Sequence, residues 1–119
     1  SAPGSIVPPL SSVTTPFQDK LHAVLDEIID LDMSGPFQEA VNPEDFPDYL
    51  DYVTTPMDLS TVQSKLAAGD YEGSFDAFAE DVRLVWRNCM SYNAENSLIS
   101  QHAQQLSQMF EGLLAKVPR

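Results

Sequence analysis

Four prolines lie close together in the first half of the chain, and they exclude a regular helix from that stretch. They are Pro36, Pro43, Pro47 and Pro56. A proline ring removes a backbone N–H and disfavours helical geometry in the residue before it. Before residue 34 and after residue 57, apolar residues recur at steps of three and four, which is typical of one face of a helix. No strand-like alternation of useful length appears. The pattern therefore predicts an all-α fold with one long loop.

The first helix has a clear start signal at Thr15-Pro16-Phe17-Gln18. Thr15 suits the N-cap, Pro16 the first helical position and Gln18 the third, and together they form a capping box. The apolar stripe that follows consists of Phe17, Leu21, Val24, Ile28 and Leu31. Gly35-Pro36 is expected to end this helix.

Three further helices are expected after the loop, each preceded by a residue whose side chain can cap a helix N-terminus. The caps are Asp58, Ser74, and either Asn96 or Ser97, and Gly69 ends the first of these helices. The inward-facing residues are Leu59, Val62 and Leu66, then Phe75, Phe78, Val82, Val85, Trp86 and Cys89, then Ile99, Ala103, Leu106, Phe110, Leu113 and Val117. Four helices with one long and two short connections predict a helical bundle.

The stretch from residue 34 to 57 is longer than most loops of compact domains, and such long loops often carry function. It is also rich in large apolar side chains, whose exposure to water would be costly. These are Phe37, Val41, Phe46, Tyr49, Tyr52, Val53 and Met57. We therefore expect the loop to fold back onto the helices.

The length of 119 residues suits one domain, and 43% hydrophobic residues is within the globular range. We expect residues 1–14 to be a flexible lead-in, or residues foreign to the natural protein, and residues 15–119 to form the bundle. Cys89 is the single cysteine, so no internal disulfide can form, in agreement with a reducing compartment. No apolar run is long enough to span a membrane.

The charge balance is strongly acidic, with 6 Lys and Arg against 18 Asp and Glu and a net charge of -12. Binding to a phosphate backbone requires basic patches, so direct nucleic-acid binding is not expected. An acidic surface attracts basic partners instead. The same charge can also serve only to prevent aggregation.

Signals for enzymes and metal sites are absent from the sequence. No nucleophile elbow, glycine-rich phosphate loop or zinc-protease motif occurs. His22 and His102 lie far apart on helical patterns, where they read as surface or half-buried residues. Cys89 reads as a packed thiol, because no nearby cation would lower its pKa. We expect neither catalysis nor a metal or cofactor. We expect Asp45 and Asp48 to be solvated, and the alternative is that they are charges at the rim of a pocket formed by the loop.

Short motifs with a definite order and spacing lie in the long loop, at the end of the third helix and at the start of the fourth. They are Gly35-Pro36-Phe37, Val41, Phe46-Pro47-Asp48-Tyr49, Thr55-Pro56-Met57-Asp58, Asn88-Cys89-Met90-Ser91-Tyr92-Asn93 and Ile99. At these residues the chain strongly resembles the bromodomain family, over roughly residues 17 to 117. The resemblance implies a left-handed four-helix bundle with a ligand pocket at one end. It also implies that the ligand is acetylated lysine.

The resemblance assigns expected roles to eight residues of this chain. It implies that Asn93 anchors the acetyl group and that Tyr49 contacts the acetyl carbonyl through a water. The remaining expected site residues are Val41 and Phe46 as apolar walls, Pro36 and Phe37 as shelf and floor, Tyr92 before the anchor, and Ile99 as gatekeeper. Many family members carry a tryptophan where this chain has Gly35. The outer shelf is therefore expected to be smaller and more open.

The chemistry of acetyl-lysine agrees with such a pocket. Acetylation turns a hydrated ammonium into a neutral amide, and an Asn side chain offers both a donor and an acceptor to it. An unmodified lysine would lose its hydration there and find no carboxylate, so we expect the site to reject it. Each residue also has a purely structural interpretation: Asn93 as a helix C-cap, Tyr49 and Ile99 as core residues, and Phe37, Val41 and Phe46 as loop packing.

The resemblance indicates a nuclear reader of acetylated lysine peptides, with histone tails as the expected partners. We expect a monomeric module that belongs to a larger protein. Two alternatives remain open at this point. One is a helical interaction module whose acyl-lysine pocket is degenerate. The other is an enzyme that processes acyl-lysine, although no candidate base or nucleophile lines the expected site.

Overall fold

A computed structural model describes residues 16–71 and 74–117 of the chain. Within these residues every regular element is helical: α1 (Pro16–Ile29), the 3-10 helix η2 (Asp32–Phe37), α2 (Tyr49–Tyr52), α3 (Leu59–Ala67), α4 (Phe75–Tyr92) and α5 (Leu98–Ala115). The predicted all-α bundle is confirmed. The expected lead-in 1–14, the cap Thr15 and the side chain of Phe17 lie outside the described residues.

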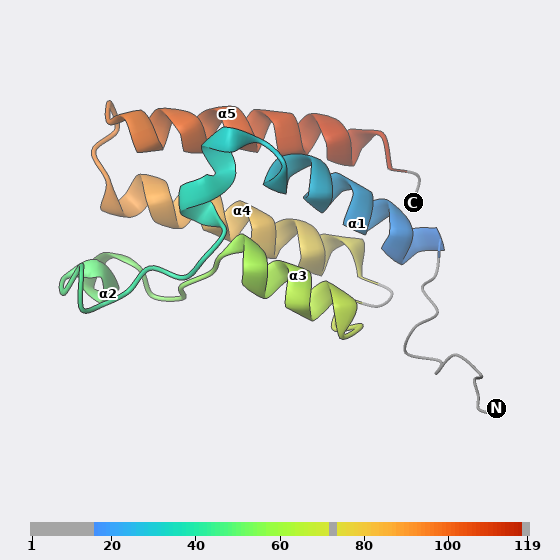
Figure 1. Ribbon diagram of the computed structural model, residues 1–119, viewed down its shortest axis with the longest axis horizontal. Helices are drawn as coiled ribbons and strands as arrows, with labels where there is room; N and C mark the ends of the chain where they lie inside the picture. The colour runs from blue at the N-terminus through green and yellow to red at the C-terminus, as the bar shows by residue number, and fades with distance from the viewer. Residues whose placement is uncertain (1–15, 72–73, 118–119) are drawn as a thin grey trace.

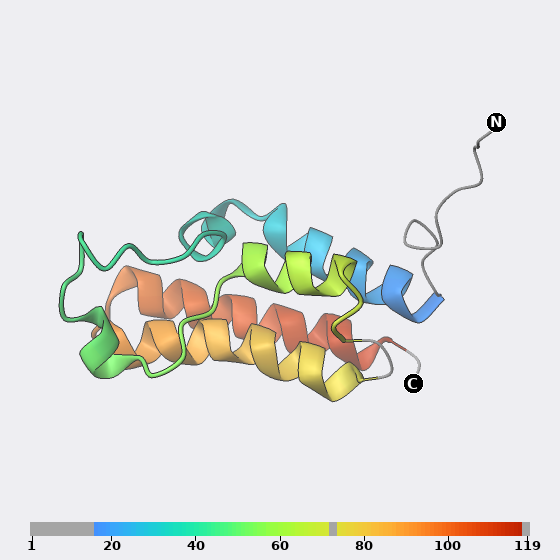
Figure 2. The same cartoon turned by 90° about the horizontal axis from the view of Figure 1, so that it is seen from below.

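The four longer helices contact one another in a closed ring, α1 against α3, α3 against α4, α4 against α5 and α5 against α1. Figures 1 and 2 show them running along the long axis of the molecule, with α1 and α3 stacked on α4 and α5. The loop between α1 and α3 extends to one end of the bundle, where α2 packs against α4. The end of α4 and the start of α5 lie at that same end.

Side-chain caps start three of the helices at the predicted residues. Asp58 Oδ2 accepts a hydrogen bond from the Thr61 N–H at 3.0 Å, and Ser74 Oγ accepts one from the Ala77 N–H at 3.2 Å. Ser97, rather than Asn96, caps α5. Each cap satisfies a backbone N–H that has no partner inside its helix.

The end of the first helix was predicted too late in the chain. The α-helix ends at Ile29, and Gly35-Pro36 lies inside η2 instead. The Ile29 carbonyl accepts hydrogen bonds from Ser34 Oγ at 2.9 Å and from Gln38 Nε2 at 3.0 Å. These side chains satisfy a carbonyl that the ending helix leaves free. The helix therefore ends seven residues before Pro36.

The helices enclose one apolar core. The largest side chains that are almost entirely buried are Trp86, Phe78, Phe110, Leu21, Leu25 and Ile28. Burial of each such side chain contributes roughly 1.5–3 kcal/mol. The core continues into the long loop through Phe37, whose ring meets Trp86 edge to face at 5.4 Å between centroids. Phe37, the predicted floor of the pocket, is thus part of the core.

The long loop folds onto the bundle only in part. Phe37, Tyr49 and Val53 are buried, as expected, but Phe46 and Tyr52 are exposed by 47% and 59%. The loop is also less irregular than predicted, because η2 and the single turn α2 form within it. The prolines limit these helical pieces to short segments.

Candidate ligand-binding site

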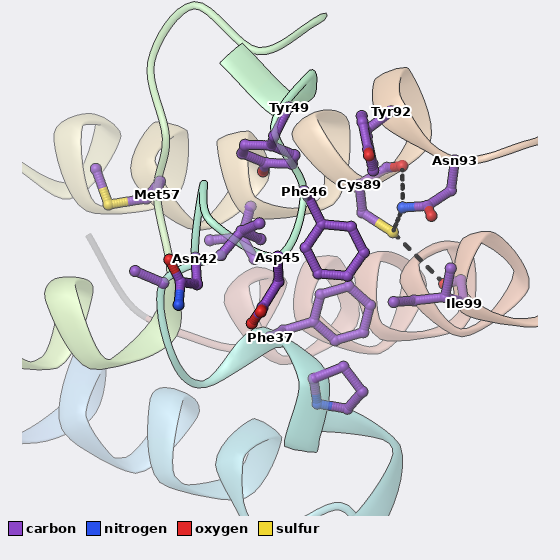
Figure 3. A pocket seen from close by; sticks show the side chains of 14 residues that line it. Phe37, Asn42, Asp45, Phe46, Tyr49, Met57, Cys89, Tyr92, Asn93 and Ile99 are labelled. Carbon is purple, nitrogen blue, oxygen red and sulfur yellow. Dashed lines mark hydrogen bonds between the residues drawn. The ribbon is translucent and has the colours of Figure 1, made fainter.

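A cavity of about 340 Å³ lies at the end of the bundle between the long loop, the end of α4 and the start of α5. Its lining includes all eight residues predicted for the site: Pro36, Phe37, Val41, Phe46, Tyr49, Tyr92, Asn93 and Ile99. Six further residues complete the wall: Ala40, Asn42, Asp45, Met57, Val85 and Cys89. Figure 3 shows these side chains arranged around the opening.

Asn93 is the C-cap of α4, and its side chain is held from one side. Its Nδ2 donates to the Cys89 carbonyl at 3.0 Å and approaches Cys89 Sγ at 3.6 Å (Figure 3). A carboxamide has two N–H donors and one oxygen acceptor. One N–H is used by the carbonyl and the other only by a weak contact to sulfur. The Oδ1 atom accepts no hydrogen bond from any described residue.

Tyr49 brings a second polar group to the cavity. The residue is 6% exposed, and its hydroxyl makes no hydrogen bond to a residue in the described part of the chain. Burial, with a smaller contribution from the Cys89 thiol, raises the pKa of Tyr49 above its usual value. The phenol therefore stays neutral at physiological pH and can both donate and accept a hydrogen bond.

Tyr92 organises the rim of the cavity. Its hydroxyl donates to Asp48 Oδ1 at 2.6 Å, and this bond to a carboxylate raises the pKa of Tyr92 to about 12. The rings of Phe46, Tyr49 and Tyr52 each meet the Tyr92 ring edge-on, at centroid distances of 6.0, 5.0 and 5.6 Å. These contacts join the long loop to the last turn of α4.

The remaining wall beside Asn93 is apolar. Ile99 is partly buried and packs against the core, and the Cys89 thiol donates to the Ile99 carbonyl at 3.7 Å. Burial raises the pKa of Cys89, so the thiol is protonated at neutral pH. This agrees with the packed role predicted for Cys89, although the residue also forms part of the cavity wall.

One expectation about charge needs correction. The sequence predicts that a lysine entering the cavity meets no carboxylate, and that Asp45 is solvated or, alternatively, a rim charge. Asp45 is exposed, but it also lines the cavity. Figure 3 shows its carboxylate well separated from the Asn93 amide. The apolar part of the cavity beside Asn93 thus contains no acid, whereas the wall formed by the loop contains one.

Asn88 is a residue to which the sequence analysis assigned no role. It is buried on α4, and its Nδ2 donates to the Thr55 carbonyl at 2.8 Å. The bond ties the long loop to α4 at Thr55. Thr55 is two residues before Met57, which lines the cavity. A polar residue on the buried side of a predicted helix was the signal that could have identified this tether.

Neither a metal site nor a membrane-spanning helix is present in the described residues. In the described part of the chain, no group of His, Cys, Asp and Glu side chains is placed to hold a metal ion. No helix there is both long and apolar enough to cross a bilayer.

The described residues form a helical bundle with a ligand-sized cavity at one end. Comparison with known families agrees, because residues 21–105, more than half of the chain, match the family model described as Bromodomain. The chain belongs to the bromodomain family, and it is an acetyl-lysine reader module.

Curated relatives carry a similar segment within much longer proteins. Histone acetyltransferase GCN5 of Debaryomyces hansenii is 40% identical over 91 residues, which are 76% of this chain and 20% of that protein. Bromodomain and PHD finger-containing protein 3 of Homo sapiens is 35% identical over 104 residues, 87% of this chain and 8% of that protein. Tyrosine-protein kinase BAZ1B of Danio rerio is 35% identical over 97 residues, 82% and 6% respectively. The chain spans a fifth or less of these relatives.

Proposed function

We propose that the cavity binds the acetylated side chain of a lysine, with the Asn93 carboxamide as its anchor. The observation that carries this proposal is the unsatisfied part of that amide: a weakly used N–H and an Oδ1 without a partner among the described residues, beside an apolar wall. The acetyl carbonyl accepts from the N–H, and the ligand N–H donates toward Oδ1. The bond from Nδ2 to the Cys89 carbonyl keeps the amide oriented while the ligand binds.

Tyr49 takes the second polar role in this proposal. Its neutral hydroxyl bonds to a water that in turn bonds to the acetyl carbonyl. At about 30 Å³ per water, a cavity of about 340 Å³ holds the lysine tip together with several waters. Bridging waters of this kind cost little affinity. Val41, Phe46 and Ile99 enclose the aliphatic stem, while Pro36 and Phe37 form the shelf and floor.

Selectivity for the acetylated form follows from desolvation. A neutral amide that gains two hydrogen bonds enters the apolar wall region at small cost. An ammonium loses hydration worth several kcal/mol and meets no carboxylate beside Asn93. The site therefore rejects unmodified lysine because it lacks a carboxylate for the ammonium, as much as it selects acetyl-lysine through two hydrogen bonds.

The proposal extends to the setting of the module. Residues 15–119 form one monomeric domain of a larger nuclear protein, and the partner is an acetylated basic peptide such as a histone tail. The chain supplies no catalytic group and needs no metal or cofactor. The acidic surface favours such a partner and disfavours nucleic acid. Affinity is weak, near micromolar or weaker, because the contact area is small.

Calorimetric titration of singly acetylated and unmodified histone peptides tests the proposal. Wild type binds only the acetylated form. Asn93→Ala loses two hydrogen bonds to the ligand, so its affinity falls by about 10- to 100-fold. Asn96→Ala is the matched control, because Asn96 is an exposed amide outside the cavity.

A thermal melt of each variant shows whether the bundle is intact. Equal affinity of wild type and Asn93→Ala, or no binding of acetylated peptides by either, contradicts the proposal. The second result instead favours a helical interaction module with a degenerate pocket. Mass spectrometry of the peptide after prolonged incubation shows whether any turnover occurs.

A further inference from the structure

The positive and negative charges of this chain are distributed unevenly. Between Leu21 and Ser64 the sequence has no lysine or arginine. The same stretch carries ten carboxylates: Asp26, Glu27, Asp30, Asp32, Glu39, Glu44, Asp45, Asp48, Asp51 and Asp58. It contains the whole long loop, so one wall of the cavity has an uncompensated negative charge.

Three cations of the later helices are paired with carboxylates outside the long loop. Lys65 Nζ pairs with Asp81 at 2.7 Å, and Arg83 pairs with Glu111 at 2.8 Å. Arg87, the cation nearest to Asn93 along α4, approaches Glu80, which lies about two turns back toward the start of that helix. No lysine or arginine lines the cavity. The negative field at the mouth is therefore left for a ligand to neutralise.

Asp45 is the carboxylate best placed to meet that ligand. Of the acidic residues in the loop, it alone lines the cavity. Its backbone N–H donates to the Asn42 carbonyl at 3.0 Å, and the Phe46 N–H donates to the same oxygen at 3.1 Å. This tight turn fixes the backbone from which the side chain extends. The carboxylate itself forms no ion pair with a described residue, whereas Asp48 is bonded to Tyr92.

A second, independent feature of the cavity indicates that a ligand binds between these walls. Tyr49 is 6% exposed and lines the same cavity, and its hydroxyl has no hydrogen-bond partner among the described residues. A polar group that faces a cavity without a protein partner can take a hydrogen bond from a bound molecule or water. Tyr49 and Asn93 suit the neutral tip of a bound side chain. Asp45 is exposed and lies apart from Asn93 in Figure 3, so it suits a cation beside that side chain.

We propose that Asp45 is a specificity residue that recognises a lysine or arginine flanking the acetyl-lysine. The inference rests on the proposed function, because it requires the acetylated side chain to occupy the cavity. It has a consequence for neighbouring modifications. Acetylation of the flanking lysine removes the charge that Asp45 meets. The module therefore prefers a singly acetylated basic segment to the same segment with two acetyl groups.

Titrations with three peptides at low salt test this inference. Each has one central acetyl-lysine, flanked by lysines, by glutamines or by acetyl-lysines. An exposed ion pair contributes up to about 1 kcal/mol, which corresponds to about a five-fold effect on affinity. Wild type should bind the lysine-flanked peptide about two- to five-fold more tightly than either of the others. The preference should shrink as salt is added.

Asp45→Asn keeps the size of the side chain and removes its charge, so the ratio of affinities should fall to about one. The matched control is Asp76→Asn, an exposed carboxylate in the first turn of α4, at the other end of that helix from Asn93. It should keep the wild-type ratio. The inference is overturned if wild type shows no preference, if Asp45→Asn retains it, or if Asp76→Asn loses it equally.

These outcomes are separable from failure of the proposed function. The glutamine-flanked peptide carries no flanking charge, so its binding compared with that of its unacetylated form reports on the acetyl-lysine site alone. Acetyl-dependent binding without a charge preference leaves the function standing and removes the role of Asp45. Absence of acetyl-dependent binding by every peptide overturns both.

Discussion

Replacing Asn88 by alanine removes the hydrogen bond that ties the long loop to α4. Asn88 Nδ2 donates to the Thr55 carbonyl at 2.8 Å, and the side chain is buried. Thr55 belongs to the segment that leads to Met57 in the cavity wall. The substitution should therefore lower both the stability of the bundle and its affinity for acetyl-lysine, although Asn88 itself does not line the cavity.

The expected magnitude follows from the burial of the bond. A buried hydrogen bond contributes about 1 kcal/mol net, and leaving one partner unsatisfied costs about 1–3 kcal/mol. Thr55 is exposed, so water can reach its carbonyl once the amide is gone. The lower part of that range, about 1–2 kcal/mol, therefore applies. For a domain of this size the loss lowers Tm by roughly 4–8 °C.

Differential scanning fluorimetry and urea titration measure the loss of stability, and calorimetry with an acetylated peptide measures the loss of affinity. Loosening the loop reduces the population of the binding-competent state, and affinity falls by the same factor, up to about ten-fold. Asn96→Ala, an exposed amide on the next loop, is the control. If Asn88→Ala melts and binds like wild type, this bond does not hold the cavity wall.

Three further predictions concern single side chains. Tyr49→Phe should keep the fold and weaken acetyl-peptide binding by about 2- to 10-fold in calorimetry, because one water-mediated bond is lost; unchanged affinity would exclude the water-mediated contact. Iodoacetamide should label Cys89 slowly at pH 7.5, since burial raises its thiol pKa, and an acetylated peptide should slow labelling further in mass spectrometry; a peptide without effect on the rate argues against occupancy of this cavity. The Arg83 guanidinium lowers the pKa of Glu111, so this pair stabilises the fold above the ordinary carboxyl pKa of about 4.3 and loses that effect as the pH falls. Urea midpoints of wild type and Glu111→Gln should differ slightly at pH 7 and converge near pH 3, and a difference that grows toward low pH would contradict the sign.

The helices and their starts could be predicted because the signals are local. Each helix that the apolar periodicity predicts after the long loop is capped by a nearby side chain, that of Asp58, Ser74 or Ser97. The end of the first helix could not be predicted in this way. Ser34 and Gln38 end it by donating to the Ile29 carbonyl across several residues of the folded chain. Gly35 and Pro36 are the stronger signals in the sequence, but the side-chain bonds from Ser34 and Gln38 end the helix before the chain reaches them.

The lining of the cavity shows a similar division. Asn93, Tyr49 and Ile99 were predicted from motifs, and the structure brings all three to one cavity. For Asp45 a solvated role and a rim charge were both open, because charge alone does not reveal which side of a loop faces a cavity. Asn88 received no role, because its partner is a backbone carbonyl 33 positions away in sequence. A polar residue on the buried side of a predicted helix indicates that a partner exists, but it does not indicate which distant backbone group that partner is.

The proposed recognition of acetyl-lysine depends on the side-chain amide of Asn93, and the two proton resonances of that amide report on it. In a ¹⁵N-resolved spectrum titrated with an Nε-acetyl-lysine peptide, the N–H now directed toward Cys89 Sγ should move strongly downfield, because it exchanges a weak contact for a carbonyl acceptor. The unmodified peptide should leave it unmoved. If both resonances of Asn93 stay in place while the acetylated peptide binds, the ligand does not use this amide, and the cavity is not read as proposed.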